Sequence, residues 1–345
     1  MTEQIRVGII GAGGNTKGRH IPGLQAIDGV EISVVCNRSA ESSQRAADEF
    51  GIPRIAAHWK DVVSDPALDA IMIGTWPYLH APISIAALQA GKHVLCEARM
   101  AMNAKEAAEM LLASKSRPDL IAQIVPSPFT LAWDQFIKRK LDEGMIGEVL
   151  AVDVFANAGN FINVERKMNW RDDVRLSGLN TMALGIYYEA MARWLGHAET
   201  IKAHGRIQVK RRMDAENQLH DLHIPDHLDV FGNLKSGASY HLRCSQLTGA
   251  CPTPNDFILY GSTGTLRVNI ASGELTLIRP ENSPEVLSVP ESEQESWRVE
   301  EEFIGAIRGN ENIRLTSFPE AYKYMSFTQK VADQLQLAPS EIRNP

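Results

Sequence analysis

The chain has 345 residues, of which 44% are hydrophobic and 22% are charged, and this composition excludes a largely disordered protein. Its net charge of −7 argues against a nucleic-acid partner, because such proteins usually gather a basic face. No apolar run approaches the roughly 20 residues that a membrane helix needs, so we expect no membrane association and a cytoplasmic location. The four cysteines show no paired spacing, which predicts reduced thiols.

The first structured stretch, residues 5–18, reads as a strand, a glycine turn and the start of a helix. Gly11 permits the tight turn, Gly13 lets the backbone approach a pyrophosphate, and the helix N-terminus stabilises the negative charge. The third glycine of a G-x-G-x-x-G motif would fall at position 16, which is threonine. We therefore expect Gly14 or Gly18 to take its role after a one-residue expansion of the loop, with Asn15 among the cofactor contacts. A turn that only joins a strand to a helix is the alternative.

The end of the next predicted strand, residues 30–36, bears on the choice of cofactor. NAD-binding folds usually carry an acidic residue there, which binds the adenosine ribose. This chain has Asn37, Arg38 and Ser39 instead. A cation and a hydroxyl suit a 2′-phosphate, so the sequence favours NADP over NAD. The alternative is that Arg38 is a solvated side chain in a turn.

Strands and helices then alternate up to about residue 126, which predicts a Rossmann domain (1–126) with a doubly wound parallel sheet of the α/β class. Thr75 and Trp76 follow an apolar strand, at the sheet edge where such folds bind ligands, and His80 begins the next helix. His80 could contact the cofactor or cap the helix. The expected helices cover 41–50, 59–63, 80–90 and 103–116, and the expected strands cover 53–57, 68–75 and 92–100.

The pattern changes after residue 126, where one helix (131–144) precedes a series of extended segments with turns typical of hairpins. This predicts an α+β domain (127–345) with an open-faced, mainly antiparallel sheet. Two further helical stretches are expected, at 179–195 and at the end of the chain. The extended segments are 149–159, 200–209, 227–234, 238–247, 256–262, 264–271 and 274–280.

Several stretches together resemble the glucose-fructose oxidoreductase and inositol dehydrogenase (Gfo/Idh/MocA) family over essentially the full length. They are VGIIGAGG, AALQAGKHVLCEARMAMNAKEA, DEGMIGEV, WRDDVRLSG, LGIYYEAMARWLG, LYGSTGTLRV and EEFIGAIRG. The resemblance implies hydride transfer between NAD(P) and a sugar, cyclitol or related alcohol, with a small-molecule substrate. It also implies that the second-domain sheet builds the interface of a homodimer or homotetramer.

The chain departs from the family at three polar positions. Glu97, Ala98 and Arg99 stand where the family usually has Glu-Lys-Pro, and Ala183 and Tyr187 stand where it places an Asp and a His. In one reading the site has been rebuilt, and Tyr187 exchanges the proton in place of the histidine. A nearby cation, Arg99 or Arg171, would then lower the pKa of Tyr187, with Asn180 beside it.

In the second reading, the chain binds the dinucleotide without ordinary alcohol oxidation. It would be a sensor, or a lyase or hydrolase that uses a tightly held cofactor transiently. The sequence favours the dehydrogenase.

The remaining polar residues allow two interpretations each. The resemblance places Glu97 beside the nicotinamide, but Glu97 could equally brace its loop. Arg171 could anchor an oxygen-rich or carboxylated substrate, or lie on the surface with Trp170 packed below it. His220, His223 and His227 could ligate zinc. Because Pro225 breaks any helix that would align them, we expect a strand there and no metal.

Overall fold

The computed structural model describes residues 4–157, 159–253 and 255–337, in two compact units. Within these residues the first unit holds 4–126 and 298–325, and the second holds 127–297 and 326–337. The prediction that everything after 126 forms the second domain is therefore wrong for 298–325. The expected strand 149–159 includes position 158, and the expected second domain runs to 345; position 158 and positions 338–345 lie outside the described residues.

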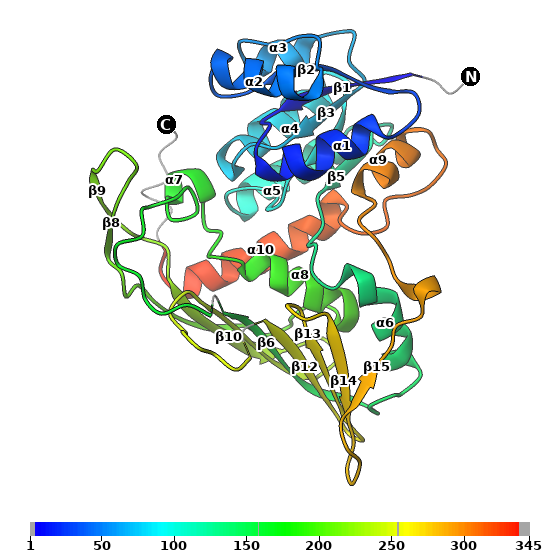
Figure 1. Ribbon diagram of the computed structural model, residues 1–345, viewed down its shortest axis with the longest axis vertical. Coiled ribbons are helices and arrows are strands. Elements are labelled where there is room, and N and C mark those ends of the chain that lie inside the picture. The colour runs from blue at the N-terminus through cyan, green and yellow to red at the C-terminus, as the bar shows by residue number, and fades with distance from the viewer. Residues whose placement is uncertain (1–3, 158, 254, 338–345) are drawn as a thin grey trace. The chain divides into compact units, whose positions relative to one another are not determined.

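The first unit is built on a parallel sheet, as predicted, and the five strands of this sheet lie in the order β2-β1-β3-β4-β5 (Figure 1). Its central strands are buried along nearly their whole length, because helices cover both faces of a doubly wound sheet. The strands are β1 (Ile5–Ile10), β2 (Val30–Cys36), β3 (Ala70–Ile73), β4 (His93–Cys96) and β5 (Ala122–Ile124).

The helices of this unit follow local sequence signals. Ser39 and Asn103 cap α2 and α5 through hydrogen bonds from backbone N–H groups, and Gly91 takes the positive φ expected after α4. The expected strand at 53–57 is reduced to one bridge between Ile55 and Val35. The helical elements are η1 (Thr16–His20), α1 (Ile21–Gln25), α2 (Ala40–Phe50), α3 (Trp59–Ser64), η2 (Pro77–Leu79), α4 (His80–Gln89), α5 (Ala104–Lys115) and α9 (Val299–Ile307).

Buried polar contacts explain why the late segment 298–325 joins the first unit. The Gln123 side chain donates to Glu302 on α9 at 3.0 Å, and Arg314 pairs with the same carboxylate. The backbone N–H of Met100 donates to the Tyr324 hydroxyl on α10 (Phe318–Gln334) at 2.6 Å. These partners are about 180 to 220 residues apart in sequence, so local patterns could not indicate them.

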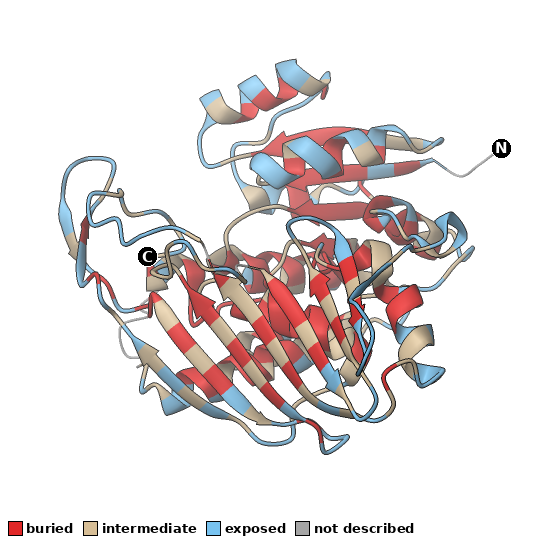
Figure 2. Cartoon of the chain, turned by 60° about the horizontal axis from the view of Figure 1, so that its bottom comes forward, coloured by how far each residue is buried: buried red, intermediate tan, exposed pale blue. Residues whose placement is uncertain are grey.

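The second unit contains a sheet of eight strands in the order β15-β14-β13-β12-β6-β11-β10-β7. All neighbours are antiparallel except β6 and β11, which run parallel. Buried and more exposed residues alternate along the strands, as expected for a sheet with one covered face (Figure 2). The strands are β6 (Val149–Asn157), β7 (Lys202–Arg206), β10 (His227–Asn233), β11 (Ser239–Ser245), β12 (Asp256–Gly261), β13 (Thr265–Asn269), β14 (Glu274–Ile278) and β15 (Glu285–Leu287).

Helix α8 (Leu184–Leu195) packs on the covered face of this sheet, where the Trp194 and Phe257 rings meet edge to face. Asp134, at the start of α6 (Asp134–Asp142), is buried and pairs with Arg193 of α8. The unit also contains η3 (Leu131–Trp133), α7 (Val174–Ser177), η4 (Glu291–Glu293) and an unpredicted hairpin of β8 (Arg211–Met213) and β9 (Leu219–Asp221). Within the described ranges, each helix is too short or too polar to cross a membrane. The cytoplasmic location stays a prediction.

Candidate cofactor and substrate sites

The glycine turn after β1 has the geometry that the sequence predicts for its first two glycines. Gly11 has a φ of +91°, and a Cβ there would stand 2.6 Å from the backbone nitrogen of Thr75. At Gly13 the nearest atom to such a Cβ is 3.7 Å away, and at Gly14 none of the described atoms lies within 4 Å. Gly11 is therefore required by the fold, whereas the backbone at Gly13 and Gly14 is open for a ligand.

The role of the third glycine is filled differently from the prediction. Neither Gly14 nor Gly18 makes a close approach to described atoms; instead, a Cβ at Gly74 would stand 2.0 Å from the Thr16 hydroxyl oxygen. That hydroxyl donates to the Gly11 carbonyl at 3.1 Å. The extra residue does not enlarge the loop, because the helix absorbs it as the single π-helical turn η1. Gly74, directly after the neighbouring strand β3, thus allows the close packing of helix on strand.

A cavity of about 380 Å³ lies over this turn. Thr75 lines this cavity, and its buried hydroxyl oxygen has no hydrogen-bond partner among the described residues, as expected of a group that pairs with a polar ligand. Together with the open backbone at Gly13, this fits the pyrophosphate and adenosine half of a dinucleotide. The lining residues are Ile10, Gly11, Ala12, Gly13, Cys36, Asn37, Arg38, Ser42, Ala57, His58, Trp59, Gly74, Thr75, Trp76, Tyr78 and Leu79.

The three residues after β2, Asn37, Arg38 and Ser39, have different structural roles. The Asn37 side chain accepts from the Ala12 N–H at 2.6 Å and donates to the Ser42 carbonyl at 2.9 Å, so it supports the glycine turn. Ser39 uses its hydroxyl to cap α2. Only Arg38 presents an exposed side chain to the cavity, and its guanidinium lies 5.8 Å from the Trp76 ring centroid.

His80 braces the sheet edge. Its ring is fully buried between the carbonyl oxygens of Thr75 and Arg99, at 2.9 and 2.8 Å. Burial lowers the pKa of His80, whereas the two carbonyl contacts act in the opposite direction. Arg99 is itself only 3% exposed. The ring therefore joins two loops at the sheet edge and does not cap α4, whose N-terminus has no side-chain cap hydrogen bond, and contact of His80 with the cofactor stays a prediction.

Glu97, directly after β4, belongs to a buried cluster that also contains His20 and Glu300. Nε2 of His20 lies 3.0 Å from Glu97, and Nδ1 contacts Glu300 of α9. Asn15 donates to Glu97. Burial by itself lowers the pKa of His20, but the hydrogen bonds to Glu300 and Glu97 outweigh this effect and raise that pKa to about 9. Burial likewise favours a higher pKa for Glu97, yet His20 and Asn15 hold the pKa of that carboxyl below its usual range.

In the second unit, the predicted lowering of the Tyr187 pKa is wrong. The phenol is 5% exposed, packs between the rings of Phe129 and Phe257, and donates to the Asn255 side chain at 2.8 Å. Burial raises the pKa of Tyr187, with a smaller contribution from Cys244. The rings of Phe129 and Phe257 surround the phenol, where the sequence predicted the cation of Arg99 or Arg171. Asn180 is buried as well, and its amide donates to the Ser177 carbonyl at 2.6 Å.

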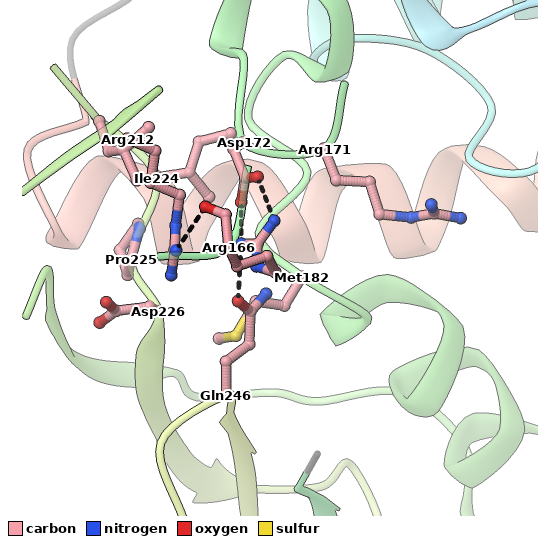
Figure 3. Close-up of a pocket in the computed structure, with 10 residues that line it drawn as sticks. Arg166, Arg171, Asp172, Met182, Arg212, Ile224, Pro225, Asp226 and Gln246 are labelled. Atoms are coloured by element: carbon pink, nitrogen blue, oxygen red, sulfur yellow. Dashed lines mark hydrogen bonds and ion pairs between the residues drawn. The ribbon is translucent and has the colours of Figure 1, made fainter. Parts of the chain in front are cut away.

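Arg171 lies on the surface of its own unit, with its guanidinium 4.3 Å from the Trp170 ring centroid. Arg171 also lines a small pocket with Arg166 and Gln246, and Figure 3 shows its side chain pointing away from these two residues. There Arg166 forms a two-pronged ion pair with Asp172 at 2.8 and 2.9 Å. The pocket measures about 10 Å³, enough for one water molecule and far too little for a sugar.

The three clustered histidines serve different partners. His220 pairs with Asp214 at 2.6 Å, whereas His227, on β10, contacts Ser245 and Asp229. His223 lines a separate cavity beside α7. Within the described residues, no group of three or more His, Cys, Asp or Glu side chains has the arrangement of a metal site.

Sequence reasoning missed several residues of these sites. His20 and Glu300 lie 280 residues apart, and Gly74 acts only through its lack of a side chain. Trp59 and Tyr78 reach the cavity from separate segments. The one usable signal was the histidine nine residues after Gly11, at the end of the extended turn.

Comparison with known proteins identifies the class. The family model of the oxidoreductase family with an NAD-binding Rossmann fold matches residues 5–123, and the model of the GFO/IDH/MocA C-terminal domain matches 135–267. The chain therefore belongs to the Gfo/Idh/MocA family of oxidoreductases, as the resemblance implied.

Individual relatives are more distant. An uncharacterized oxidoreductase, ORF334, from Rhizobium meliloti is 30% identical over 56% of this chain and 57% of its own length. A 1,5-anhydro-D-fructose reductase from Ensifer adhaerens is 32% identical over 44% of each chain. The chain thus aligns with only about half the length of these relatives. A solved levoglucosan dehydrogenase, in complex with NADH and L-sorbose, superposes with a TM-score of 0.82 over 98% of both chains at 18% identity, which shows a shared fold.

The first prediction concerns the pH dependence of stability. Because the pKa of His20 rises from 6.5 to about 9 on folding, its stabilising contribution is complete below pH 6.5 and is lost as the pH rises through 9. We expect the free energy of unfolding to fall by roughly 3 kcal/mol over this range, measured by urea denaturation. A His20→Gln variant should lack this slope. Equal urea midpoints for the wild type at pH 6.5 and 9.5 would contradict the assignment.

The second prediction separates the two glycines. Gly11→Ala should lower the free energy of unfolding by about 2 kcal/mol or more, because its Cβ meets the backbone at Thr75 and its φ is positive. Gly13→Ala should fold with nearly wild-type stability but bind NADP at least about tenfold more weakly, because its Cβ occupies the approach of the pyrophosphate. Thermal denaturation and titration calorimetry measure the two effects. Unaltered NADP binding by Gly13→Ala would exclude this turn as the pyrophosphate site.

Proposed function

We propose that this protein is an NADP-preferring oxidoreductase that transfers a hydride between nicotinamide and a hydroxyl- or carbonyl-bearing carbon of a sugar-like or cyclic polyol. The observation that carries the proposal is the cavity over the glycine turn, with its open backbone at Gly13 and the unpartnered buried hydroxyl of Thr75. Family membership supports the reaction class. The bound nicotinamide would supply the hydride donor or acceptor.

The preference for NADP rests on charge. Arg38 is the exposed cation of the cavity lining, and it stands at the start of α2, where the helix dipole also favours an anion. The chain places no carboxylate immediately after β2, where NAD-specific folds use one for the ribose hydroxyls. Stacking on Trp76 holds the guanidinium near the cavity. The NADH in the levoglucosan dehydrogenase complex belongs to a protein that is only 18% identical.

The substrate class is proposed from the relatives. One is a 1,5-anhydro-D-fructose reductase and another is a levoglucosan dehydrogenase, so both act on sugar derivatives. Arg171 is the proposed contact for an oxygen-rich group of the substrate, because its guanidinium is exposed and held by Trp170.

The protonation state of Tyr187 bears on the direction of the proposed reaction. Because burial raises the pKa of Tyr187, the phenol keeps its proton at neutral pH and suits a general acid better than a base. We therefore propose carbonyl reduction, in which the carbon accepts the hydride, the carbonyl oxygen accepts the phenolic proton, and solvent returns a proton to Tyr187. Asn255, which accepts the phenolic hydrogen bond, would position the group.

A second candidate is binding of the dinucleotide without alcohol turnover, as in a sensor or a lyase or hydrolase with a tightly held cofactor. The specific observation in its favour is the enclosure of Tyr187 by Phe129 and Phe257. Ala98 and Ala183 add no group that can exchange a proton.

We also propose that the protein is a homodimer or homotetramer. The less buried face of the eight-stranded sheet exposes Phe231 and Tyr260, which are 49% and 36% accessible. Large apolar groups on such a face are typical of a protein interface. Light scattering would measure the mass in solution, and a monomer at micromolar concentration would exclude the proposal.

A substitution at Arg38 tests the cofactor preference. Arg38→Ala should weaken NADP binding at least about tenfold and NAD binding less than about twofold, because only NADP carries the 2′-phosphate. Arg45→Ala, which removes an exposed arginine of the same helix that pairs with Glu41, is the matched control. Titration calorimetry gives both affinities. Equal losses for the two cofactors would show that Arg38 does not recognise the phosphate.

A substitution at Tyr187 tests the proton route. Tyr187→Phe should lower kcat for carbonyl reduction by about 100-fold or more while NADPH affinity stays within about twofold, as for loss of a general acid. Tyr188→Phe removes the neighbouring phenol, which bonds to the Ala198 N–H, and should retain turnover. Rates come from NADPH absorbance with a panel of sugar and cyclitol ketones. A fully active Tyr187→Phe would remove this residue from the mechanism; binding of NADPH without wild-type turnover would favour the second candidate.

A further inference from the structure

The cluster of His20, Glu97 and Glu300 has an unusual charge for a buried site. The side chains of His20 and Glu300 are 0% and 1% exposed, and that of Glu97 is 15% exposed. One imidazolium between two carboxylates leaves a net charge of −1. This sum is the same if a proton moves from His20 to a carboxylate, because the number of protons in the cluster does not change.

Two features of the glycine turn and α1 accommodate the three side chains of the cluster. Glu300 lies against α1 at Gly23, where an added Cβ would stand 2.9 Å from its Cγ. The π-helical turn η1 ends at His20, so the extra residue in the glycine turn sets the position of the ring. Asn15, at the start of that turn, donates to Glu97. The cluster is therefore joined directly to the glycine turn, which is the proposed pyrophosphate site.

Sheet topology indicates which end of the dinucleotide would meet the cluster. The strand order of the sheet reverses at β1, because β2 lies on one side of it and β3 and β4 lie on the other. In such folds a dinucleotide binds across this switch point. The cavity with Asn37 and Arg38 follows β2, on the adenosine side. Glu97 follows β4 on the opposite side, and its N–H donates to the Ile73 carbonyl at 2.9 Å. The nicotinamide end therefore belongs beside Glu97.

We propose that the net negative charge of the His20, Glu97 and Glu300 cluster makes this protein bind the oxidised nicotinamide cofactor more tightly than it would without the cluster, and biases the bound redox couple toward the oxidised form. The inference rests on the proposed function, because it assumes that the first unit binds a nicotinamide dinucleotide. Glu97 would face the ring, and His20 and Glu300 are positioning residues that act through it.

The physical reason is the difference in ring charge. An oxidised nicotinamide carries a positive charge that the reduced ring lacks, so a fixed negative charge nearby attracts only the oxidised form. In a partly desolvated site such an interaction is worth at least about a tenfold change in affinity. Bias toward the oxidised form in turn makes the reduced cofactor a better hydride donor, which agrees with the proposed reduction.

The experiment measures binding, independent of turnover. NADP⁺ and NADPH are titrated separately into the full-length wild type, Glu97→Gln and Glu300→Gln at pH 6, well below the pKa of about 9 that His20 has in the wild type. Each variant removes one carboxylate from the cluster. We expect the ratio of the NADP⁺ to the NADPH dissociation constant to rise about tenfold in both variants, with NADPH affinity nearly unchanged. The effect of Glu300→Gln is the sharper test, because that side chain is buried away from any ligand.

Glu302→Gln is the matched control. It removes another buried carboxylate of α9, which bonds to Gln123 and Arg314, and should leave the ratio unchanged. An unchanged ratio in Glu97→Gln, or an equal loss of both cofactor forms, would overturn the inference while leaving the proposed function intact. Failure of the wild type to bind either form would instead overturn the proposed function. If Glu300→Gln does not fold, Glu97→Gln alone decides the matter.

Discussion

The pairing of His20 with Glu97 and Glu300 is the interaction on which the organisation of the first unit depends. It joins the helix after the glycine turn, the end of β4 and helix α9, whose residue Glu300 lies 280 positions further along the chain. Removing His20 would leave two carboxylates in a buried site without their cationic partner, which costs several kcal/mol. Residues 298–325 belong to the first unit, and through Glu300 they contact His20, the residue that ends the glycine turn of the proposed cofactor site.

Polar side chains have different surroundings at the cofactor cavity of the first unit and around Tyr187 of the second unit. Around the cavity, polar groups are kept available: the Thr75 hydroxyl has no partner among the described residues, and Arg38 remains exposed. In the second unit, the phenol of Tyr187 is enclosed by aromatic rings and donates its hydrogen bond to Asn255. The first arrangement suits reversible ligand binding. The second raises the pKa of the phenol, so that the phenol keeps its proton at neutral pH.

Sequence reasoning reached the fold and the cofactor turn because both depend on local patterns. Apolar strands of 4 to 7 residues indicated the parallel sheet, and hairpin turns such as the one at Gly237 indicated the second sheet. The same reasoning failed where distant segments decide the outcome. It could not find Glu300 beside His20, nor anticipate that Gly74 would replace the third glycine of the motif. It also assigned Tyr187 a cationic neighbour, because the helix pattern does not reveal what packs against the phenol.

A crystal structure of the protein with NADP⁺ tests the central claim most directly, namely that the first unit holds a phosphorylated dinucleotide across the switch point of its sheet. The account predicts the 2′-phosphate at Arg38, the pyrophosphate above Gly13 and the nicotinamide ring beside Glu97. A dinucleotide bound in the reverse orientation or elsewhere on the chain, or no bound dinucleotide at saturating concentration, would contradict it.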